Sequence, residues 1–412
     1  MAGVNANLSL IEQAHQLRAA RYVVAAGVVA ALHVGKLPPA LPVLRDVLGI
    51  TLLEAGFLLS LVQLAGMTLG LLAGLVTQRV GLKRSMMAGL LVLAGASTVG
   101  GFATSATGLL VTRALEGLGF LWVVLPAPGM VRQLVPKERL NGMLGAWGAY
   151  MPLGTSLAFL VGPWVMQLAA PVWGWRLWWW LLSALAVMLA LLLAWRVPAE
   201  PARAAPAGTF LAANRQLLGL TLGSPAVWLM ALTFAVYSAQ WMAVIGFLPS
   251  IYTQNGVASH AVAWLTASVA AVNIVGNLSA GYWLQRGGRP LGLLVTGFVA
   301  MAGGALITFG LGTYPLLQYA GVLMFSMLGG LIPTTLFSLA LRLSPSLQTI
   351  PTTVGWMQQW SALGQFAGPP LVAWVALRAG GWQWTGWLTS TCCVVGVLLA
   401  WRLHRLAQPN SG

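Results

Sequence analysis

Four ionisable residues interrupt apolar stretches in the first half of the sequence: His33, Lys36, Arg113 and Glu116. A lysine or arginine at the centre of a membrane-spanning helix costs about 2.5–3.5 kcal/mol, so such residues are expected to have a function. Each pair is three positions apart, so His33 shares a helix face with Lys36, and Arg113 with Glu116. Lys36 and Arg113 predict a cationic pocket for an anionic substrate. Glu116 and His33 are expected to handle a coupled proton, because histidine titrates near neutral pH and burial disfavours a charged carboxylate.

Each of these residues also has a structural interpretation. Arg113 and Glu116 could form a static ion pair that braces one helix, which would leave His33 as the main proton carrier. Lys36 could instead reach outward through the proline-rich break that follows it. His33 itself could be a hydrogen-bonded core residue. These alternatives remain open at the level of sequence.

The second half of the chain offers neutral partners for a substrate. Tyr237, Gln240 and Asn273 lie in apolar stretches and are predicted to bind substrate. Gln240 and Asn273 are favoured because the internal repeat described below aligns them with His33 and with a glycine. The alternative for each is an interhelical hydrogen bond.

The elements that must position these residues are membrane helices. Hydrophobic residues make up 58% of the chain and charged residues 7%, which excludes a soluble domain of this length. The net charge of +15 is spread singly between apolar runs, so we expect no nucleic-acid partner. A helix needs about 20 apolar residues to cross a bilayer. Twelve such spans are predicted, near 21–44, 52–76, 85–104, 107–131, 141–168, 176–195, 227–250, 261–284, 291–312, 315–341, 350–377 and 383–402.

The predicted fold is therefore an all-α membrane protein with twelve transmembrane helices in two six-helix halves. The halves are residues 1–195 and 226–412, and a polar, proline-containing linker at 196–225 separates them. With a cytoplasmic N-terminus, sixteen of the 21 basic residues face inside, whereas Arg45, Arg176 and Arg378 face outside and two lie within spans. This positive-inside bias predicts that both termini are cytoplasmic. The expected location is the cytoplasmic (inner) membrane of a bacterium.

The two halves repeat one another at an offset of 207 residues. Gly281, Gln285, Arg286 and Gly288 match Gly74, Gln78, Arg79 and Gly81 in register, and Pro333 matches Pro126. Parallel six-span repeats are typical of one class of secondary transporters, in which the substrate site lies between the halves near the midplane.

The chain resembles the major facilitator superfamily over essentially its whole length. The turn after the second span is similar to that family's glycine- and arginine-rich signature, with glutamine where the family usually has aspartate. The fourth span resembles a second signature at Arg113, Glu116, Gly117 and Gly119, and the fifth a third signature that includes Gly162 and Pro163. A weaker resemblance, through Lys36 and Pro126, is to the cyanate-type anion transporters. The gating residues implied by the resemblance are Gly74, Gln78, Arg79, Gly81, Lys83, Arg84, Gln285, Arg286, Gly162 and Pro163.

The resemblance implies a secondary active transporter that works by alternating access and uses no cofactor. Its first, fourth, seventh and tenth spans would line a central cavity. The proposed cargo is a small organic or inorganic anion coupled to protons, and a monomer is expected. Proton-coupled export of hydrophobic or cationic drugs is the alternative within this class. An intramembrane enzyme or a channel is disfavoured, because the sequence shows no filter and its histidines are too scattered to hold a metal: His15, His33, His260 and His404.

Overall fold

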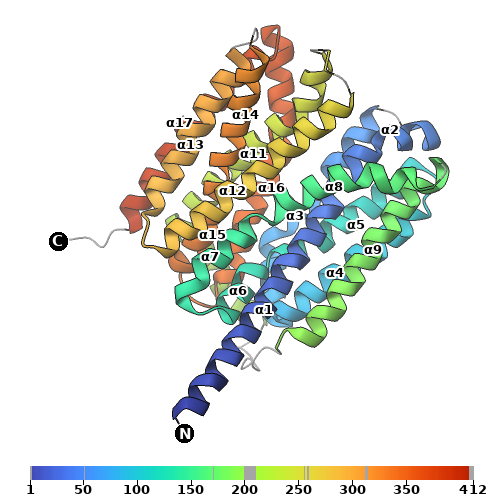
Figure 1. Ribbon diagram of the computed structural model, residues 1–412. Helices are drawn as coiled ribbons and strands as arrows, with labels where there is room; N and C mark the ends of the chain where they lie inside the picture. The colour runs from blue at the N-terminus through green and yellow to red at the C-terminus, as the bar shows by residue number, and fades with distance from the viewer. Residues whose placement is uncertain are drawn as a thin grey trace.

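The structure is a computed structural model that describes residues 2–50, 52–169, 171–198, 210–254, 256–257, 259–310 and 314–407. Within these ranges the chain is built from helices joined by short turns (Figure 1). Ten of the described segments are long and apolar enough to cross a membrane. Helices α4 and α16 lie in the same bundle and complete the twelve predicted spans. The predicted all-α membrane fold is confirmed.

The N-terminal half holds six spans, of which the first, fourth and fifth are each made of two consecutive helices. Its helices are α1 (Ala2–Gly35), α2 (Leu37–Leu48), α3 (Leu52–Val80), α4 (Leu82–Gly101), α5 (Ala106–Val124), α6 (Ala127–Leu134), α7 (Lys137–Gly148), α8 (Tyr150–Gln167) and α9 (Pro171–Arg196).

The C-terminal half repeats this plan with only its fourth span divided. Its helices are α11 (Pro225–Gln254), α12 (Ser259–Gln285), α13 (Pro290–Gly310), α14 (Pro315–Gly329), α15 (Leu331–Leu343), α16 (Ile350–Ala379) and α17 (Gln383–Ala407). A further helix, α10 (Phe210–Leu222), lies in the predicted linker and contacts α11 and α16.

The divided spans break where prolines remove backbone donors. A proline has no N–H group and its ring clashes with the preceding turn, so a helix that contains one kinks or breaks. Pro126 and Pro333, which align in the repeat, both lie at or just after such a break. The other two breaks are followed by Pro38 and Pro152.

The two halves meet along two pairs of helices. One pair is α3 with α16, and the other is α12 with the broken span α7–α8. In Figure 1 the blue-to-green half lies to the lower right of the yellow-to-red half. We call the ends that carry the turns after α3 and α12 the inner ends of the bundle.

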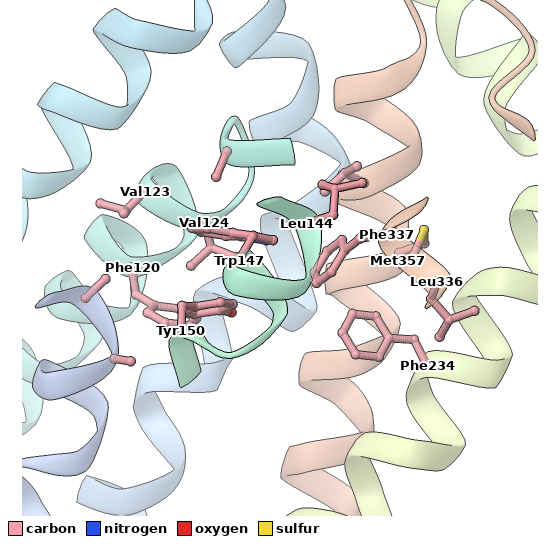
Figure 2. Close-up of a cluster of buried hydrophobic side chains, with 14 of the residues drawn as sticks. Phe120, Val123, Val124, Leu144, Trp147, Tyr150, Phe234, Leu336, Phe337 and Met357 are labelled. Atoms are coloured by element: carbon pink, nitrogen blue, oxygen red, sulfur yellow. The ribbon is translucent and has the colours of Figure 1, made fainter. Parts of the chain in front are cut away.

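Aromatic side chains form much of the buried core between the halves (Figure 2). From the N-terminal half, Trp147 stacks on Tyr150 with ring centroids 4.4 Å apart. Phe337 from the C-terminal half meets Trp147 edge-on at 6.5 Å and Phe234 at 5.6 Å. Offset and edge-on ring pairs contribute about 0.5–1.5 kcal/mol each beyond their buried area. This layer joins the halves near the middle of the bundle.

Candidate functional site

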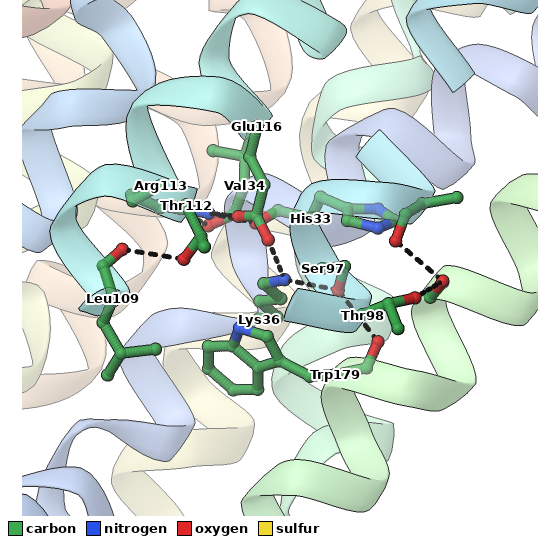
Figure 3. A network of polar contacts seen from close by, with 12 residues as sticks. His33, Val34, Lys36, Ser97, Thr98, Leu109, Thr112, Arg113, Glu116 and Trp179 are labelled. Carbon is green, nitrogen blue, oxygen red and sulfur yellow. Dashed lines mark hydrogen bonds and ion pairs between the residues drawn. The ribbon is translucent and has the colours of Figure 1, made fainter. Parts of the chain in front are cut away.

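The structure brings His33, Lys36, Arg113 and Glu116 into one buried cluster inside the N-terminal half (Figure 3). None of these side chains is more than 3% exposed. Lys36 and His33 come from the broken first span, whereas Arg113 and Glu116 come from α5. Convergence of the first and fourth spans creates the cluster.

Arg113 donates hydrogen bonds to backbone carbonyls at the break in the first span. Pro38 has no N–H to offer the carbonyl of Val34, which would be its partner in a continuous helix. The Arg113 guanidinium donates to that carbonyl at 3.0 Å and to the carbonyl of His33, and its Nε donates to Leu58 O at 3.1 Å. Arg113 therefore fastens the break in span 1 to both α5 and α3.

Glu116 accepts from both buried cations. Its Oε1 pairs with Lys36 Nζ, and its Oε2 accepts from Arg113 at 2.9 Å. Lys36 also donates to Ser97 Oγ at 2.9 Å and lies over the ring of Trp179, 4.4 Å from its centroid. With Glu116 ionised, two cations and one carboxylate leave this cluster with a net charge of +1.

His33 has one ring nitrogen in use. Its Nδ1 lies 3.0 Å from the carbonyl of Val29, and since a carbonyl only accepts, Nδ1 carries the proton. Its Nε2 is buried and has no hydrogen-bond partner among the described residues. In this tautomer Nε2 is an unused hydrogen-bond acceptor beside the cluster.

A separate cavity of about 70 Å³, enough for several waters, lies between the two halves. None of the described residues that line it is charged, and the amide groups come from Gln63, Asn273, Gln358 and Gln365. Gln63 donates to Gln365 across the interface at 2.9 Å, and Gln358 hydrogen-bonds Tyr150. Aromatic walls complete the cavity: Phe120, Tyr150, Phe234, Tyr237, Trp241 and Phe337.

Two of the three predicted neutral partners line this cavity. Tyr237 and Asn273 do so, and Asn273 donates to the Tyr237 hydroxyl at 3.3 Å. Gln240 is buried elsewhere, where it donates to Val236 O and accepts from Cys393 Sγ. Lys36 and Arg113 are also outside the lining.

The sequence analysis missed Gln63, Gln365 and Tyr150 as lining residues. The two glutamines are isolated amides in the middle of apolar spans, and that signal could have found them. Tyr150 follows the break before α8, which turns its side chain toward the other half.

The inner ends of the halves are in close backbone contact. A Cβ atom on Gly70 would lie 2.7 Å from the carbonyl oxygen of Gly355, and one on Gly74 would lie 2.8 Å from that of Pro351. On the other helix pair, a Cβ on Gly145 would lie 3.0 Å from the Cα of Gly281. Only glycine permits these approaches, so the inner side of the cavity is closed in this conformation.

Gln285 takes part in this closure. Its side-chain oxygen accepts from the backbone N–H of Gly142 at 3.0 Å, which bridges the end of α12 and the first turns of α7. Beside it, Asn141 donates to Leu284 O at 3.1 Å and accepts from Ser338 at 2.8 Å. These neutral hydrogen bonds connect the halves where the gating turns were predicted.

The other predicted gating residues occupy several environments. Lys83 donates to the carbonyls of Ala194 and Val197 at the end of α9, and Gly81 has a φ of 97° that favours glycine. Arg79 and Arg84 are exposed, and Arg286 lies over the ring of Tyr282. The side chain of Gln78 lies outside the described residues.

Gly162 and Pro163 lie within α8, away from the inner closure. A Cβ on Gly162 would lie 3.4 Å from Pro39 of the first span and from Trp178 of α9, which is ordinary contact. The Gly162–Pro163 segment therefore packs the fifth span against the first and sixth spans inside the N-terminal half.

Comparison with known proteins identifies the family. The sequence profile of the Major Facilitator Superfamily matches residues 23–346 and 229–412. The chain belongs to the Major Facilitator Superfamily. Over 380 residues it is 26% identical to the inner membrane metabolite transport protein YgcS of Escherichia coli (strain K12), covering 82% of this chain and 80% of that protein.

Solved structures of superfamily members share the fold. The proton:xylose symporter XylE matches with a TM-score of 0.77 at 14% identity, covering 96% of this chain and 99% of XylE. FucP in its outward conformation matches with a TM-score of 0.76 at 16% identity, and the match covers 96% of this chain and 100% of the FucP chain. The human organic anion transporter MFSD10 matches with a TM-score of 0.76 at 16% identity, and the match covers 93% of this chain and 99% of the MFSD10 chain. The family match and the curated relative, together with the apolar helices, make this chain a membrane-embedded transporter of the superfamily and not an enzyme.

Proposed function

We propose that this superfamily member moves a small organic anion, coupled to protons, through the cavity between its halves. The observation that carries the proposal is the position of the charged cluster beside that cavity. Phe120, which lines the cavity, follows Glu116 by four residues on α5 and lies on the same helix face. The cluster is therefore about 6 Å along the helix axis from the lining.

The cluster acts on the cavity through its net charge. Glu116 neutralises only one of the two cations, and burial limits screening by salt. At a separation of about 10 Å and an effective dielectric constant of about 20, one charge contributes about 1.7 kcal/mol, more than tenfold in affinity. Gln63 and Gln365 each donate one amide N–H within the protein and have a second N–H for a solute, and the aromatic walls contact the organic part of the solute.

The coupled proton is assigned to His33. Both oxygens of Glu116 are occupied by cations, whereas the Nε2 of His33 is buried and has no partner among the described residues. A proton on Nε2 adds a second positive charge to the cluster. Proton binding then strengthens anion binding, which is the sign required for the two to move together.

The test compares carboxylic acids with their matched amides. Binding of each acid, and of the amide of the same shape, is measured for the purified wild-type protein and for the Lys36→Met variant. The control variant is Arg215→Met, which also loses one positive charge, but from an exposed position. In Lys36→Met the remaining Arg113–Glu116 pair is neutral. We expect acid affinity to fall about tenfold or more while amide affinity stays unchanged, and Arg215→Met to resemble wild type. An equal loss for acids and amides contradicts an electrostatic role for the cluster.

Export of hydrophobic cations is the second candidate. The aromatic walls favour it, because ring faces attract cations, most strongly when desolvated. Stabilisation of the protein by lipophilic cations but not by carboxylic acids would select this function.

Orientation and assembly complete the proposal. The bias of basic residues toward the inner ends supports cytoplasmic termini in a bacterial inner membrane, and the closed two-half bundle supports a monomer. The inner turns at Gln78 and Gln285 would open and close the cytoplasmic gate. Labelling of a cysteine at either terminus in intact cells tests the orientation, and the mass of the detergent complex tests the monomer.

A further inference from the structure

Aromatic side chains from both halves line the central cavity. Phe120 and Tyr150 of the N-terminal half have ring centroids 6.4 Å apart. In the C-terminal half, Phe234 lies 6.4 Å from Tyr237 and meets Phe337 edge-on at 5.6 Å, and all three line the cavity. Figure 2 shows the two N-terminal rings on one side and those of Phe234 and Phe337 on the other. A solute in the cavity would therefore contact rings of both halves.

The amides of Gln365 and Gln63 lie on the outer side of Phe234. Gln365 Nε2 donates to Ser361 Oγ at 3.2 Å, which in turn hydrogen-bonds Ser238 Oγ at 2.7 Å. Ser238 donates to the carbonyl of Phe234 at 2.7 Å. The carbonyls of a helix point toward its C-terminal end, and α11 begins at the inner ends of the bundle, beside the start of α16. This chain of hydrogen bonds therefore leads outward from Phe234 to the Gln365 amide, which accepts from Gln63 at 2.9 Å.

The charged cluster is also displaced toward the outer side of the cavity. Helix α5 runs inward, because α4, which precedes it, begins at the inner turn after α3. Glu116 is four residues before Phe120 on α5 and is therefore about one turn farther out. The net positive charge of the cluster and the second N–H groups of Gln63 and Gln365 thus favour an anionic group at the outer end of the cavity. The rings around Phe234 occupy its inner end.

We propose that the solute is a small aromatic carboxylate, bound with its carboxylate toward the outer end of the cavity and its ring between the aromatic side chains of the two halves. This inference rests on the proposed function and narrows the class of organic anion. The cavity measures only about 70 Å³ in this conformation, so a solute must separate its walls. A planar ring separates them least, because carbon atoms pack about 3.5–4.0 Å apart across a flat face. Offset and edge-on contacts between rings then add attraction beyond the buried area.

Two other kinds of solute fit this arrangement less well. Ring faces attract cations, but the positive cluster and the amide N–H groups would repel a cationic group at the outer end. An aliphatic acid would match the outer end and would lack the attraction between rings. Each alternative corresponds to a probe of about the same size as benzoate.

Isothermal titration calorimetry of the purified full chain tests the proposal, with benzoate as the first probe. Cyclohexanecarboxylate has the same carboxylate and a saturated ring of the same carbon number, so burial of apolar area alone predicts similar affinities for the two acids. Benzylammonium carries the aromatic ring with the opposite charge, and benzamide carries it without charge. The test variant is Phe234→Leu. The matched control is Phe309→Leu, which removes a buried ring that is not among the described residues lining the cavity.

We expect wild type and Phe309→Leu to bind benzoate about fivefold more tightly than cyclohexanecarboxylate, and Phe234→Leu to lower that ratio by about twofold to tenfold. Equal binding of the two acids by wild type, or an unchanged ratio in Phe234→Leu, overturns this inference and leaves anion transport in place. If Phe234→Leu does not purify as folded protein, Phe120→Leu is measured in the same way, and an unchanged ratio there also overturns it.

The uncharged and cationic probes separate this inference from the proposed function. Benzamide or benzylammonium that binds more tightly than both acids contradicts the proposed function together with this inference. A lack of binding by benzoate, while cyclohexanecarboxylate binds, contradicts only the aromatic class of the solute.

Discussion

Replacement of Gly70 by alanine should open the inner side of the transporter. The new Cβ would lie 2.7 Å from the carbonyl oxygen of Gly355 and 2.8 Å from the Cβ of Gln359, both on α16. Ordinary contact begins near 3.4 Å, so α3 and α16 must separate by about 0.7 Å. A backbone carbonyl cannot rotate away as the tip of a side chain can. Overpacking of this kind costs about 1–3 kcal/mol.

This clash destabilises only the conformation in which the inner ends are closed. Gly70 faces Gly355 when the inner ends are together, so separation of the halves relieves the clash. A bias of 1–3 kcal/mol shifts the equilibrium about 5- to 150-fold toward the inner-open state. Insertion and overall folding should be unaffected, because the same clash is absent once the halves part.

Spin labels can measure this shift. Val80 and Leu347 are exposed near the inner ends of the two halves and accept cysteine labels once Cys392 and Cys393 have been replaced by alanine. We expect the distance between the labels to lengthen in Gly70→Ala. The control is Gly95→Ala in α4, where a Cβ would meet nothing within 4 Å. Gly95→Ala should leave the distance unchanged and favour the helix by up to about 1 kcal/mol. An unaltered distance in Gly70→Ala would refute the packing argument.

Three further variants test the buried polar groups. Glu116→Gln leaves two buried cations without a counter-charge, so thermal unfolding should show a loss of about 3–5 kcal/mol; a change below 1 kcal/mol would mean that water already reaches the cluster. Gln285→Ala removes the acceptor for the N–H of Gly142, and chemical unfolding should show a cost of about 0.5–1.5 kcal/mol to the closed state. Tyr237→Phe removes the hydroxyl that accepts from Asn273 and leaves a buried N–H without its partner, so thermal unfolding should show a loss of about 1–3 kcal/mol; an unaltered stability would mean that water takes the place of the hydroxyl.

Much of the architecture could be predicted without coordinates. A run of about 20 apolar residues specifies a membrane helix through its own composition, so twelve spans and two repeated halves follow from the chain alone. The glycine spacing around Gly70 and Gly74 predicted close helix contact, and the structure supplies the partners in α16. Prolines similarly marked spans that break. These features depend on residues close together in sequence.

The site was predicted less completely. The depth of Lys36, Arg113 and Glu116 could be counted along each span, and it correctly suggested that the three lie near one another. The sequence could not predict which neighbouring helix each of these side chains faces, because the rotation of a helix about its axis is set by packing against its neighbours. Gln240 shows the same effect, since it points to Cys393 and away from the cavity.

The sequence by itself therefore determined the membrane class, the spans, the repeat and the residues that are costly to bury. Only the tertiary structure decided that the two cations share one carboxylate, that Arg113 completes the hydrogen bonds of a broken helix, and that the central cavity is lined by neutral groups. The reason is that apolar periodicity fixes which segments enter the membrane, whereas pairing between distant helices fixes which polar atoms are left free to bind a solute.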